Sequence, residues 1–348
     1  MYETELAKTR LSDVAQLAGV SAATASRAIN SPEKVSATLR QKVAAAITQL
    51  DYVPHGAARA LATRRSRTIG AVVPTLDFAI FAAGVVSLQN RLHAAGYTLL
   101  LANAEFDLAK EAQEVRTLIE RGVDGLVLVG ALRAPEVYGL LHRHRVPFVN
   151  TYMFSSGDDH PCIGVDQYGA AYRVVEYLLG LGHRDVAIIT SPAQDNDRIK
   201  ARCDGFLAAL RARGVRLAEH HVIEMPDIVA DSRTAMRALM TPGSEVTAVI
   251  CATDTLAIGA LAEARALGLR VPEDVSITGF DDLDLTMHTD PPLTTVHVPA
   301  AELGERAGEY LLNRINHRTV PDRLELSAKL VVRGSTAPPT PRSGRPLA

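Results

Sequence analysis

Short polar side chains and one arginine between Ser21 and Asn30 have the residue types that contact DNA. Residues 11–30 read LSDVAQLAGVSAATASRAIN, with apolar residues at helical spacing on both sides of Gly19. Glycine adopts a left-handed backbone without strain, so Gly19 can turn the chain sharply. The pattern predicts two short helices joined by a tight turn, with Ser12 and Ser21 as their N-caps. The side chains expected to face outward, toward a DNA groove, are Ala22, Ala23, Thr24, Ser26 and Arg27.

The same stretch has a second interpretation. Any small helical hairpin can contain a glycine turn and small apolar contacts, whether or not it binds DNA. Residues 11–30 alone leave both interpretations open.

Residues that could catalyse a reaction or bind a metal are scattered along the chain. Two histidine pairs lack a third ligand at metal spacing. Three cysteines, odd in number and far apart, predict reduced packing residues rather than disulfides or a zinc site. We find no serine, cysteine or histidine set with the logic of a nucleophile, so we expect no enzyme, metal site or cofactor. The residues in question are His142 with His144, His220 with His221, and Cys162, Cys203 and Cys251.

The charge of the chain is divided unevenly. Its 348 residues carry a formal net charge of -2, with 47% hydrophobic and 22% charged residues. Residues 1–67 contain ten Lys and Arg against five Asp and Glu, a net charge of +5, which leaves -7 on the remainder. A basic head on a larger acidic body is typical of a DNA-binding protein whose body has another task. No apolar run approaches the roughly 20 residues that cross a bilayer. The polar N-terminus predicts no signal peptide and a cytoplasmic location.

Short strands alternate with amphipathic helices after the head. Ser36 is expected to cap a third helix from Ala37 to Leu50, and from Thr68 onward the alternation is typical of parallel sheets covered on both faces. The expected strands are Ile69 to Val73, Thr98 to Ala102, Gly125 to Val129, Phe148 to Thr151, Val186 to Thr190, Val246 to Cys251, Val275 to Thr278, one near Leu324, and Lys329 to Val332. The expected helices lie near residues 78–95, 108–121, 134–144, 167–182, 198–213, 231–240, 254–267 and 300–316. The pattern predicts an α/β body of two doubly wound lobes.

This pattern divides the chain into four parts. Residues 1–54 form the helix-turn-helix head, 55–67 a hinge helix and basic linker, and 68–334 the two-lobed body. Within the body we expect the first lobe to take residues 68–165 and 297–323 and the second to take 166–296 and 324–334. The tail, residues 335–348, contains four prolines and no apolar period, which predicts disorder.

Motifs from about Arg10 to Gly334 resemble those of the lactose/galactose repressor family of bacterial transcription regulators. In the head they are Ser12-Asp13-Val14-Ala15, Ala18-Gly19-Val20-Ser21, Thr24, Ser26-Arg27, Val35-Ser36 and Tyr52-Val53-Pro54. In the body they are Val123-Asp124-Gly125-Leu126, Val146-Pro147, Leu181-Gly182-His183-Arg184, Asp254, Val271-Pro272-Glu273-Asp274-Val275-Ser276, Gly279-Phe280-Asp281-Asp282 and Pro292-Leu293-Thr294-Thr295-Val296. So many motifs in register favour the DNA-binding interpretation of residues 11–30. The resemblance implies an all-α helix-turn-helix head and a body similar to periplasmic sugar-binding proteins.

The resemblance also implies how the head meets DNA. In a dimer the second helices would enter adjacent major grooves, bringing Ala22, Ala23 and Arg27 to base edges. Alanine offers only methyl contact, so Arg27 is the expected polar reader. The side chains suited to phosphate oxygens are Ser12, Ser21, Thr24, Ser26, Asn30 and Ser36.

A minor-groove contact is implied for the hinge. Leu61 would wedge into the centre of the operator and kink it, with Ala57, Ala58 and Arg59 alongside. The alternative is that Leu61 is an ordinary linker residue.

By family position, the cleft between the lobes would bind a small effector. Arg202 and Asp281 match the family pattern best, and a guanidinium fork facing a carboxylate suits a polyol. Tyr152 and Thr253 stand where many members carry Asp and Asn, which argues against a plain hexose. Arg198 would favour a carboxylate or phosphate on the ligand, unless it is a solvated helix start. The implied effector residues are Asp77, Phe78, Phe81, Tyr152, Asp166, Arg198, Arg202, Thr253, Asp254 and Asp281.

Together the resemblance and the charge pattern predict a ligand-responsive, sequence-specific DNA-binding regulator on the bacterial nucleoid. The family implies a homodimer on a pseudopalindromic operator, and a repressor of carbohydrate or sugar-acid genes whose effector is a sugar, sugar acid or sugar phosphate. A cytoplasmic solute-binding protein without a regulatory role is the alternative. A third class is an enzyme that acts on the cleft ligand, but no set of residues in the sequence supports it.

Overall fold

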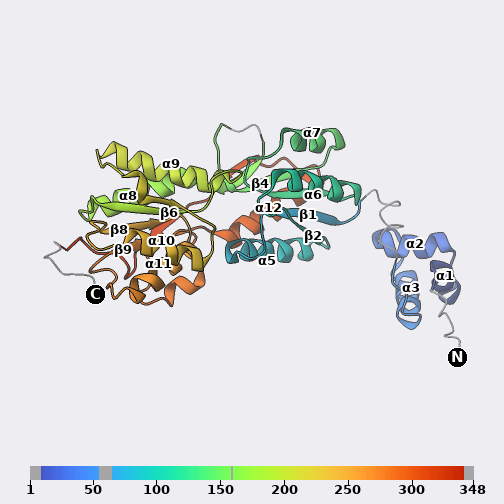
Figure 1. Ribbon diagram of the computed structural model, residues 1–348. Coiled ribbons are helices and arrows are strands. Elements are labelled where there is room, and N and C mark those ends of the chain that lie inside the picture. The colour runs from blue at the N-terminus through green and yellow to red at the C-terminus, as the bar shows by residue number, and fades with distance from the viewer. Residues whose placement is uncertain (1–8, 55–64, 158–159, 341–348) are drawn as a thin grey trace, which may run out of the picture. The chain divides into compact units, whose positions relative to one another are not determined.

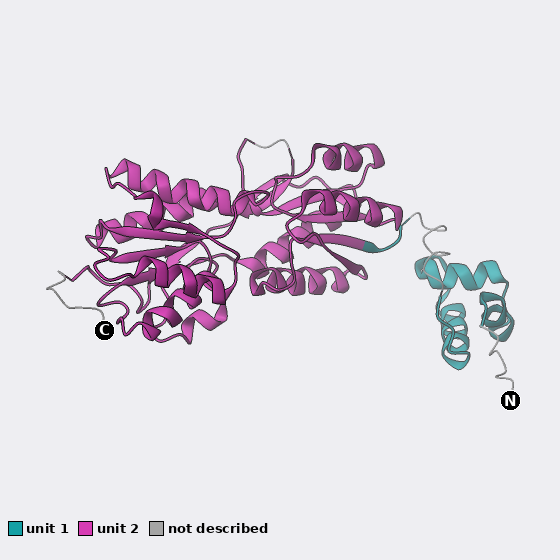
Figure 2. Ribbon diagram, viewed as in Figure 1, with its two compact units in different colours: residues 1–68 teal, residues 69–348 magenta. Residues whose placement is uncertain are grey.

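The computed structural model describes residues 9–54, 65–157 and 160–340, and divides into two compact units at Thr68 (Figure 2). The first unit is the head and the second is the body.

The described part of the head is helical, as the apolar spacing predicts. Its elements are α1 (Leu11–Ala18), α2 (Ala22–Asn30), a 3-10 turn (Pro32–Lys34) and α3 (Ala37–Gln49). Gly19 ends α1 with φ of 64°, the left-handed conformation expected for the turn. Val14 and Ala18 of α1 pack against Val43 and Ala46 of α3, and this small core fixes the crossing of the helices.

The first lobe of the body is a six-stranded sheet with helices on both faces (Figure 1). Its strand order is β11-β5-β4-β3-β1-β2, and β1, β3, β4, β5 and β11 pair in parallel. Ala71 and Val73 of β1 pack in the cluster that holds α5 and α12, whereas Val72 packs on the opposite face with α6 and α7. Successive side chains of β1 therefore pack against helices on opposite faces of the sheet, as in a doubly wound lobe. The elements are β1 (Thr68–Val73), α5 (Ala79–Ala94), β2 (Thr98–Asn103), α6 (Leu108–Glu120), β3 (Gly125–Val129), α7 (Pro135–His144), β4 (Phe148–Met153), β5 (Cys162–Val165), α12 (Ala300–Ile315) and β11 (Arg323–Glu325).

The second lobe repeats this plan with a four-stranded parallel sheet of order β7-β6-β8-β9. Ile188 of β6 faces α8 and α9, and Ile189 faces α10 and α11. The elements are α8 (Gln167–Gly180), β6 (Val186–Thr190), α9 (Asp197–Ala212), a 3-10 turn (Glu219–His221), β7 (Val222–Glu224), α10 (Val229–Leu239), β8 (Ala248–Cys251), α11 (Asp254–Ala266), β9 (Ser276–Thr278), a 3-10 turn (Asp284–Met287), β10 (Thr295–His297) and β12 (Lys329–Val331). β10 and β12 form a small antiparallel pair, which the prediction of wholly parallel sheets missed.

The strand expected near Leu324 belongs to the first lobe, not to the second. Leu324 of β11 pairs with Ile163 of β5, so the last crossing between the lobes follows Glu325. Within the described residues the chain passes between the sheets after β5, after β10 and after β11. The third of these connections lies slightly closer to the C-terminus than the lobe boundary expected after residue 323.

The predicted disorder of the tail is wrong for residues 335–340. Ser335 is fully buried, and its hydroxyl donates to the carbonyl of Ile277 (2.6 Å) and accepts from the amide of Thr294 (2.8 Å). Ala337 and Thr340 bond to the second lobe as well. A proline-rich segment stays ordered here because its polar groups find partners on strand β9 and its neighbours. Residues 341–348 lie outside the described part of the chain.

Candidate functional site

Helix α2 presents the side chains that we expect to meet base edges. Ala22, Ala23 and Arg27 are exposed, while Ala25 of the same helix is completely buried against the head core. One face of α2 is thus held by packing and the other is open to a groove.

Two of the five hydroxyl groups assigned to phosphate belong to helix N-caps. Ser21 and Ser36 are N-caps, accepting from the amides of Thr24 (3.1 Å) and Leu39 (3.4 Å). Ser12 is not a cap: α1 begins at Leu11 and has Arg10 at its N-cap, and the Asp13 carboxylate accepts from the backbone amide of Arg10 (2.8 Å). The Ser12 hydroxyl is exposed.

The remaining phosphate candidates differ in exposure. Ser26 and Asn30 are half-buried, and the Asn30 amide donates to the Ser26 hydroxyl (3.3 Å). The Thr24 hydroxyl lies 2.9 Å from that of Ser21. The minor-groove candidates Ala57, Ala58 and Leu61 fall outside the described residues.

A cleft of about 440 Å³ lies between the two lobes of the body. Eight of the ten expected effector residues line it, and they come from both lobes. They are Asp77, Phe78, Phe81, Tyr152, Arg198, Arg202, Thr253 and Asp281.

Arg202 and Asp281 are the fixed polar centre of the cleft. Arg202 is 5% exposed, and its guanidinium donates to the side chain of Gln167 (2.8 Å), the carbonyl of Ala252 (2.7 Å) and the carboxylate of Asp281 (2.9 Å). It also lies 3.8 Å above the ring of Phe280. Burial raises the pKa of Asp281, and Arg202 opposes that shift. Asp281 has φ of 122°, a strained backbone that occurs preferentially at functional sites.

An aromatic wall faces this polar centre from the first lobe. The rings of Phe78 and Phe81 are 6.3 Å apart, and Phe106 lies 6.0 Å from Phe78. Tyr152 meets Phe81 edge-on at 5.3 Å, and its hydroxyl donates to the carbonyl of Ile80 (2.9 Å). Burial raises the pKa of Tyr152, so this side chain acts as a neutral, fixed wall.

Arg198 enters the cleft as a buried cation. Only 7% of the residue is exposed, its guanidinium lies 6.0 Å from the Phe81 ring, and one of its N–H groups donates to Asp197 (2.9 Å). Burial lowers the pKa of Arg198, although arginine keeps its charge in proteins. The alternative of a solvated helix start is therefore wrong for this residue.

Two of the expected effector residues do not line the cleft. Asp166 is the N-cap of α8, accepting from the amide of Gly169 (2.9 Å). Asp254 is completely buried under the cleft, where it accepts from Thr295 (2.5 Å) and from the amide of Leu283 (2.8 Å). Both positions carry a carboxylate because the backbone needs an acceptor there.

Sequence reasoning missed Asp227 and Gln167. Asp227 lines the cleft and accepts from the Thr253 hydroxyl (2.7 Å), and burial raises its pKa to about 6. Gln167 bonds to both lobes: its side-chain N–H donates to the carbonyl of Tyr152 in the first lobe (2.7 Å), and its side-chain oxygen accepts from Arg202 in the second. No spacing in the sequence marks either residue, because each is brought to the site by the packing of its element.

A DNA-reading head joined to a two-lobed body with a lined cleft defines a ligand-responsive, DNA-binding transcriptional regulator. Residues 10–55 match the family of bacterial regulatory proteins described as lacI, and residues 175–336 match the periplasmic binding protein-like domain. The HTH-type transcriptional repressor PurR of Yersinia enterocolitica is 34% identical over 94% of this chain and 96% of its own length. The chain therefore belongs to the lacI family.

Solved structures agree with this assignment. The structure of the transcriptional regulator CelR–cellobiose complex is 31% identical and covers 94% of this chain and 99% of its own, with a TM-score of 0.69. The lac repressor dimer bound to operator and the anti-inducer ONPF has a TM-score of 0.84 at 26% identity, with the same coverage. The two-lobed fold and the family predicted from the motifs are confirmed.

The described ranges of the chain give no sign of a membrane span or a metal centre. No helix in them combines the length and apolar character that crossing a membrane requires. Nor do these residues bring three or more His, Cys, Asp or Glu side chains together at a metal-binding distance.

Proposed function

We propose that the protein is a cytoplasmic repressor of carbohydrate or sugar-acid genes, which binds a pseudopalindromic operator as a homodimer. Ala22, Ala23 and Arg27 would contact bases. Ser12, Ser21, Thr24, Ser26, Asn30 and Ser36 would contact phosphates. Ala57, Ala58 and Leu61 would enter the minor groove. Relatives named repressors, and a lac repressor dimer solved on its operator, support this assignment.

The effector that we propose is a polyhydroxylated ligand with an anionic group. The observation that carries this proposal is the arrangement of Arg202, Asp281 and Arg198 in one cleft. Asp281 can accept hydroxyl hydrogen bonds, and the buried guanidinium of Arg198 has N–H groups beyond the one given to Asp197, which suit a carboxylate or phosphate. Asp77, Phe78, Phe81, Tyr152, Thr253 and the newly found Asp227 would complete the site. The cellobiose bound to CelR supports a sugar-like ligand.

A planar heterocyclic base is the second candidate ligand. Phe78, Phe81 and Phe106 form a wall on which a flat ring could stack. Arg198 distinguishes the two candidates, because a sugar acid has an anionic group that can pair with its guanidinium, whereas a base brings no anion to it.

Thermal-shift screening against neutral sugars, aldonates, sugar phosphates and purine bases tests the ligand class. We expect an aldonate or sugar phosphate to raise the melting temperature of the wild type, and Arg198→Gln to remove most of that rise. Arg211→Gln on the exposed side of the same helix is the control. A base that stabilises both variants equally would replace the proposed class. Selection from random duplex DNA, followed by gel shift, tests the operator.

A further inference from the structure

The two lobes are joined at the cleft by the carboxylate of Asp197. Asp197 is the first residue of α9 in the second lobe, and its Oδ2 accepts from the backbone amides of Ala131 (2.6 Å) and Leu132 (3.1 Å) in the first lobe. Its Oδ1 accepts from Arg198 (2.9 Å). One carboxylate thus contacts the opposite lobe and the cleft arginine at the same time.

The loop that receives Asp197 is built to present its amides. Gly130 has φ of 79°, and a Cβ there would lie less than 3 Å from both Arg198 Nη1 and Asp197 Oδ1, so only glycine allows this approach. Consecutive backbone amides after such a residue form a concave anion-binding surface. The Asp197 carboxylate fills it.

A buried network behind the loop holds it in this conformation. Arg133 is 6% exposed and donates to the Glu111 carboxylate, the carbonyl of Gly130, the side chain of Asn150 (3.0 Å) and the hydroxyl of Tyr138 (3.1 Å). The Tyr138 hydroxyl donates in turn to the carbonyl of Ala131 (2.9 Å). All these contacts lie within the first lobe, so the amides that meet Asp197 are held in place by their own lobe.

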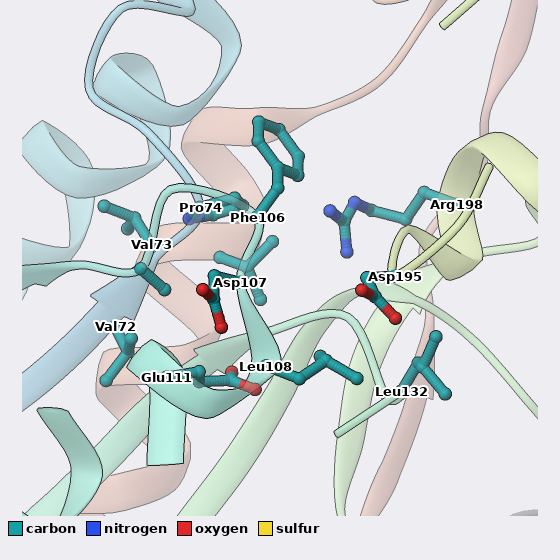
Figure 3. A pocket seen from close by; sticks show the side chains of 12 residues that line it. Val72, Val73, Pro74, Phe106, Asp107, Leu108, Glu111, Leu132, Asp195 and Arg198 are labelled. Carbon is teal, nitrogen blue, oxygen red and sulfur yellow. The ribbon is translucent and has the colours of Figure 1, made fainter. Parts of the chain in front are cut away.

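Figure 3 shows a small pocket beside this contact. Arg198 and Asp195 of the second lobe face Phe106, Asp107 and Glu111 of the first across a small pocket of about 30 Å³. The pocket shares Arg198 and Phe106 with the effector cleft. Release of Asp197 would separate these two walls and free Arg198.

We propose that Asp197 is a positioning residue that holds the two lobes together across the cleft and fixes Arg198 there. The part concerning Arg198 rests on the proposed function, whereas the closure of the lobes does not. Asp197 itself need not touch the effector. An anionic ligand group at Arg198 would compete with Asp197 and so weaken the link between the lobes.

Interlobe distance in the full-length, ligand-free protein tests the closure. Cys203, the least buried native cysteine, is first replaced by Ala. Spin labels are then attached at two exposed positions, Glu136→Cys in α7 and Arg211→Cys in α9, and pulsed electron resonance measures the distance between them. Asp197→Ala removes two charge-assisted hydrogen bonds, so we expect the open population to grow at least about tenfold. Asp204→Ala is the matched control, because Asp204 lies on the same helix and, within the part of the chain that the structure describes, forms an ion pair with the exposed Lys200.

Asp197→Asn separates the two roles of the residue. The Asn carbonyl can still accept from the loop amides, while its amide group cannot accept from Arg198. We expect wild-type distances in this variant, together with several-fold faster modification of Arg198 by phenylglyoxal, read by peptide mass spectrometry. Unchanged distances in Asp197→Ala, equal opening in Asp204→Ala, or unchanged Arg198 reactivity in both Asp197 variants would overturn the proposal. Failure of the ligand screen would instead contradict the anionic effector and leave the distance result standing.

Discussion

Arg202 and Asp281 form a buried ion pair. Because neither side chain is open to water, each charge is stabilised mainly by the other. Removing one partner of such a pair leaves the other uncompensated, which costs about 3 to 5 kcal/mol. We therefore expect Arg202→Ala to lower the free energy of unfolding by that amount in urea titrations, because Asp281 and Gln167 both lose their partner. The surviving folded protein should bind DNA without responding to effector. Wild-type stability in this variant would show that Arg202 is not held as the geometry indicates.

Arg27 is the one long polar side chain among the exposed base-contact candidates of α2. A bidentate arginine–base contact is worth about 1 to 3 kcal/mol of discrimination. Arg27→Ala should weaken operator binding by that amount and relax the preference at one base pair of each half-site. Gel shifts on a set of single-base operator variants measure this. Arg40 is exposed on α3 and donates to the carbonyl of Pro32, so Arg40→Ala is the control for a general loss of positive charge.

Asp254 makes stability depend on pH. Burial, and next the charge of Asp281, raise its pKa from 3.8 to about 7. A carboxyl whose pKa is higher in the folded protein binds more protons when folded, so stability falls as the pH rises from about 4 to about 7. This loss is on the order of 3 kcal/mol, given 1.36 kcal/mol per pKa unit.

Asp254→Asn should flatten that dependence. Its carbonyl can accept from the amide of Leu283, and its amide can donate to the Thr295 hydroxyl, so both bonds have a replacement. Urea titrations between pH 4.5 and 7.5 should show a shallower decline than in the wild type or in Asp204→Asn, which changes an exposed carboxylate. An unchanged slope would place the titration elsewhere.

At the scale of elements, the segment that follows β12 is part of the second lobe. The hydroxyl of the fully buried Ser335 donates to the carbonyl of Ile277 and accepts from the amide of Thr294. Ser335→Ala leaves both without a partner, and each unsatisfied buried group costs about 1 to 3 kcal/mol. We expect a clear loss of stability in thermal or urea unfolding, compared with little change in Thr340→Ala, whose hydroxyl is exposed. Equal effects of the two substitutions would contradict this role.

Element positions were largely predictable from the sequence, because periodicity reports burial of one face. The expected helix near 108–121 is α6 (Leu108–Glu120), and Gly125 to Val129 is β3. β7 (Val222–Glu224) was missed because it is three residues long and mostly exposed, so it carries no apolar signal. Ser335 was missed for a different reason: its order comes from partners far away in the chain.

The candidate site was predictable where a motif names the residue, and less so where packing places it. Arg202 and Asp281, which match the family pattern best, both line the cleft and pair directly with each other. Asp254 stands in a motif and Asp166 was implied by family position, yet the Asp166 carboxylate caps a helix and the Asp254 carboxylate accepts from buried donors. Asp227 has no local signature and reaches the cleft only through the fold of its loop.

For the whole molecule, the head alone cannot account for specificity. In the proposed complex α2 would offer two alanines and one arginine to the bases, so each half-site would carry little direct information. Much of the discrimination should then come from the spacing of two half-sites read by a dimer, and from the deformation of the DNA between them. Basic charge in residues 1–67 adds affinity that does not depend on sequence and weakens as salt increases.

Binding by a dimer should depend on the spacing of the two half-sites. Inserting five base pairs between the half-sites turns one of them by about half a helical turn, since B-DNA repeats every 10 to 10.5 base pairs. A dimer then engages one half-site only, and binding should fall toward the level of a random duplex, about a thousandfold or more at physiological salt. Gel shift with the selected operator, the spaced operator and a single half-site measures this, with analytical ultracentrifugation giving the stoichiometry. Equal binding to the operator and the single half-site would mean that one head acts alone, and the dimeric mode would be wrong.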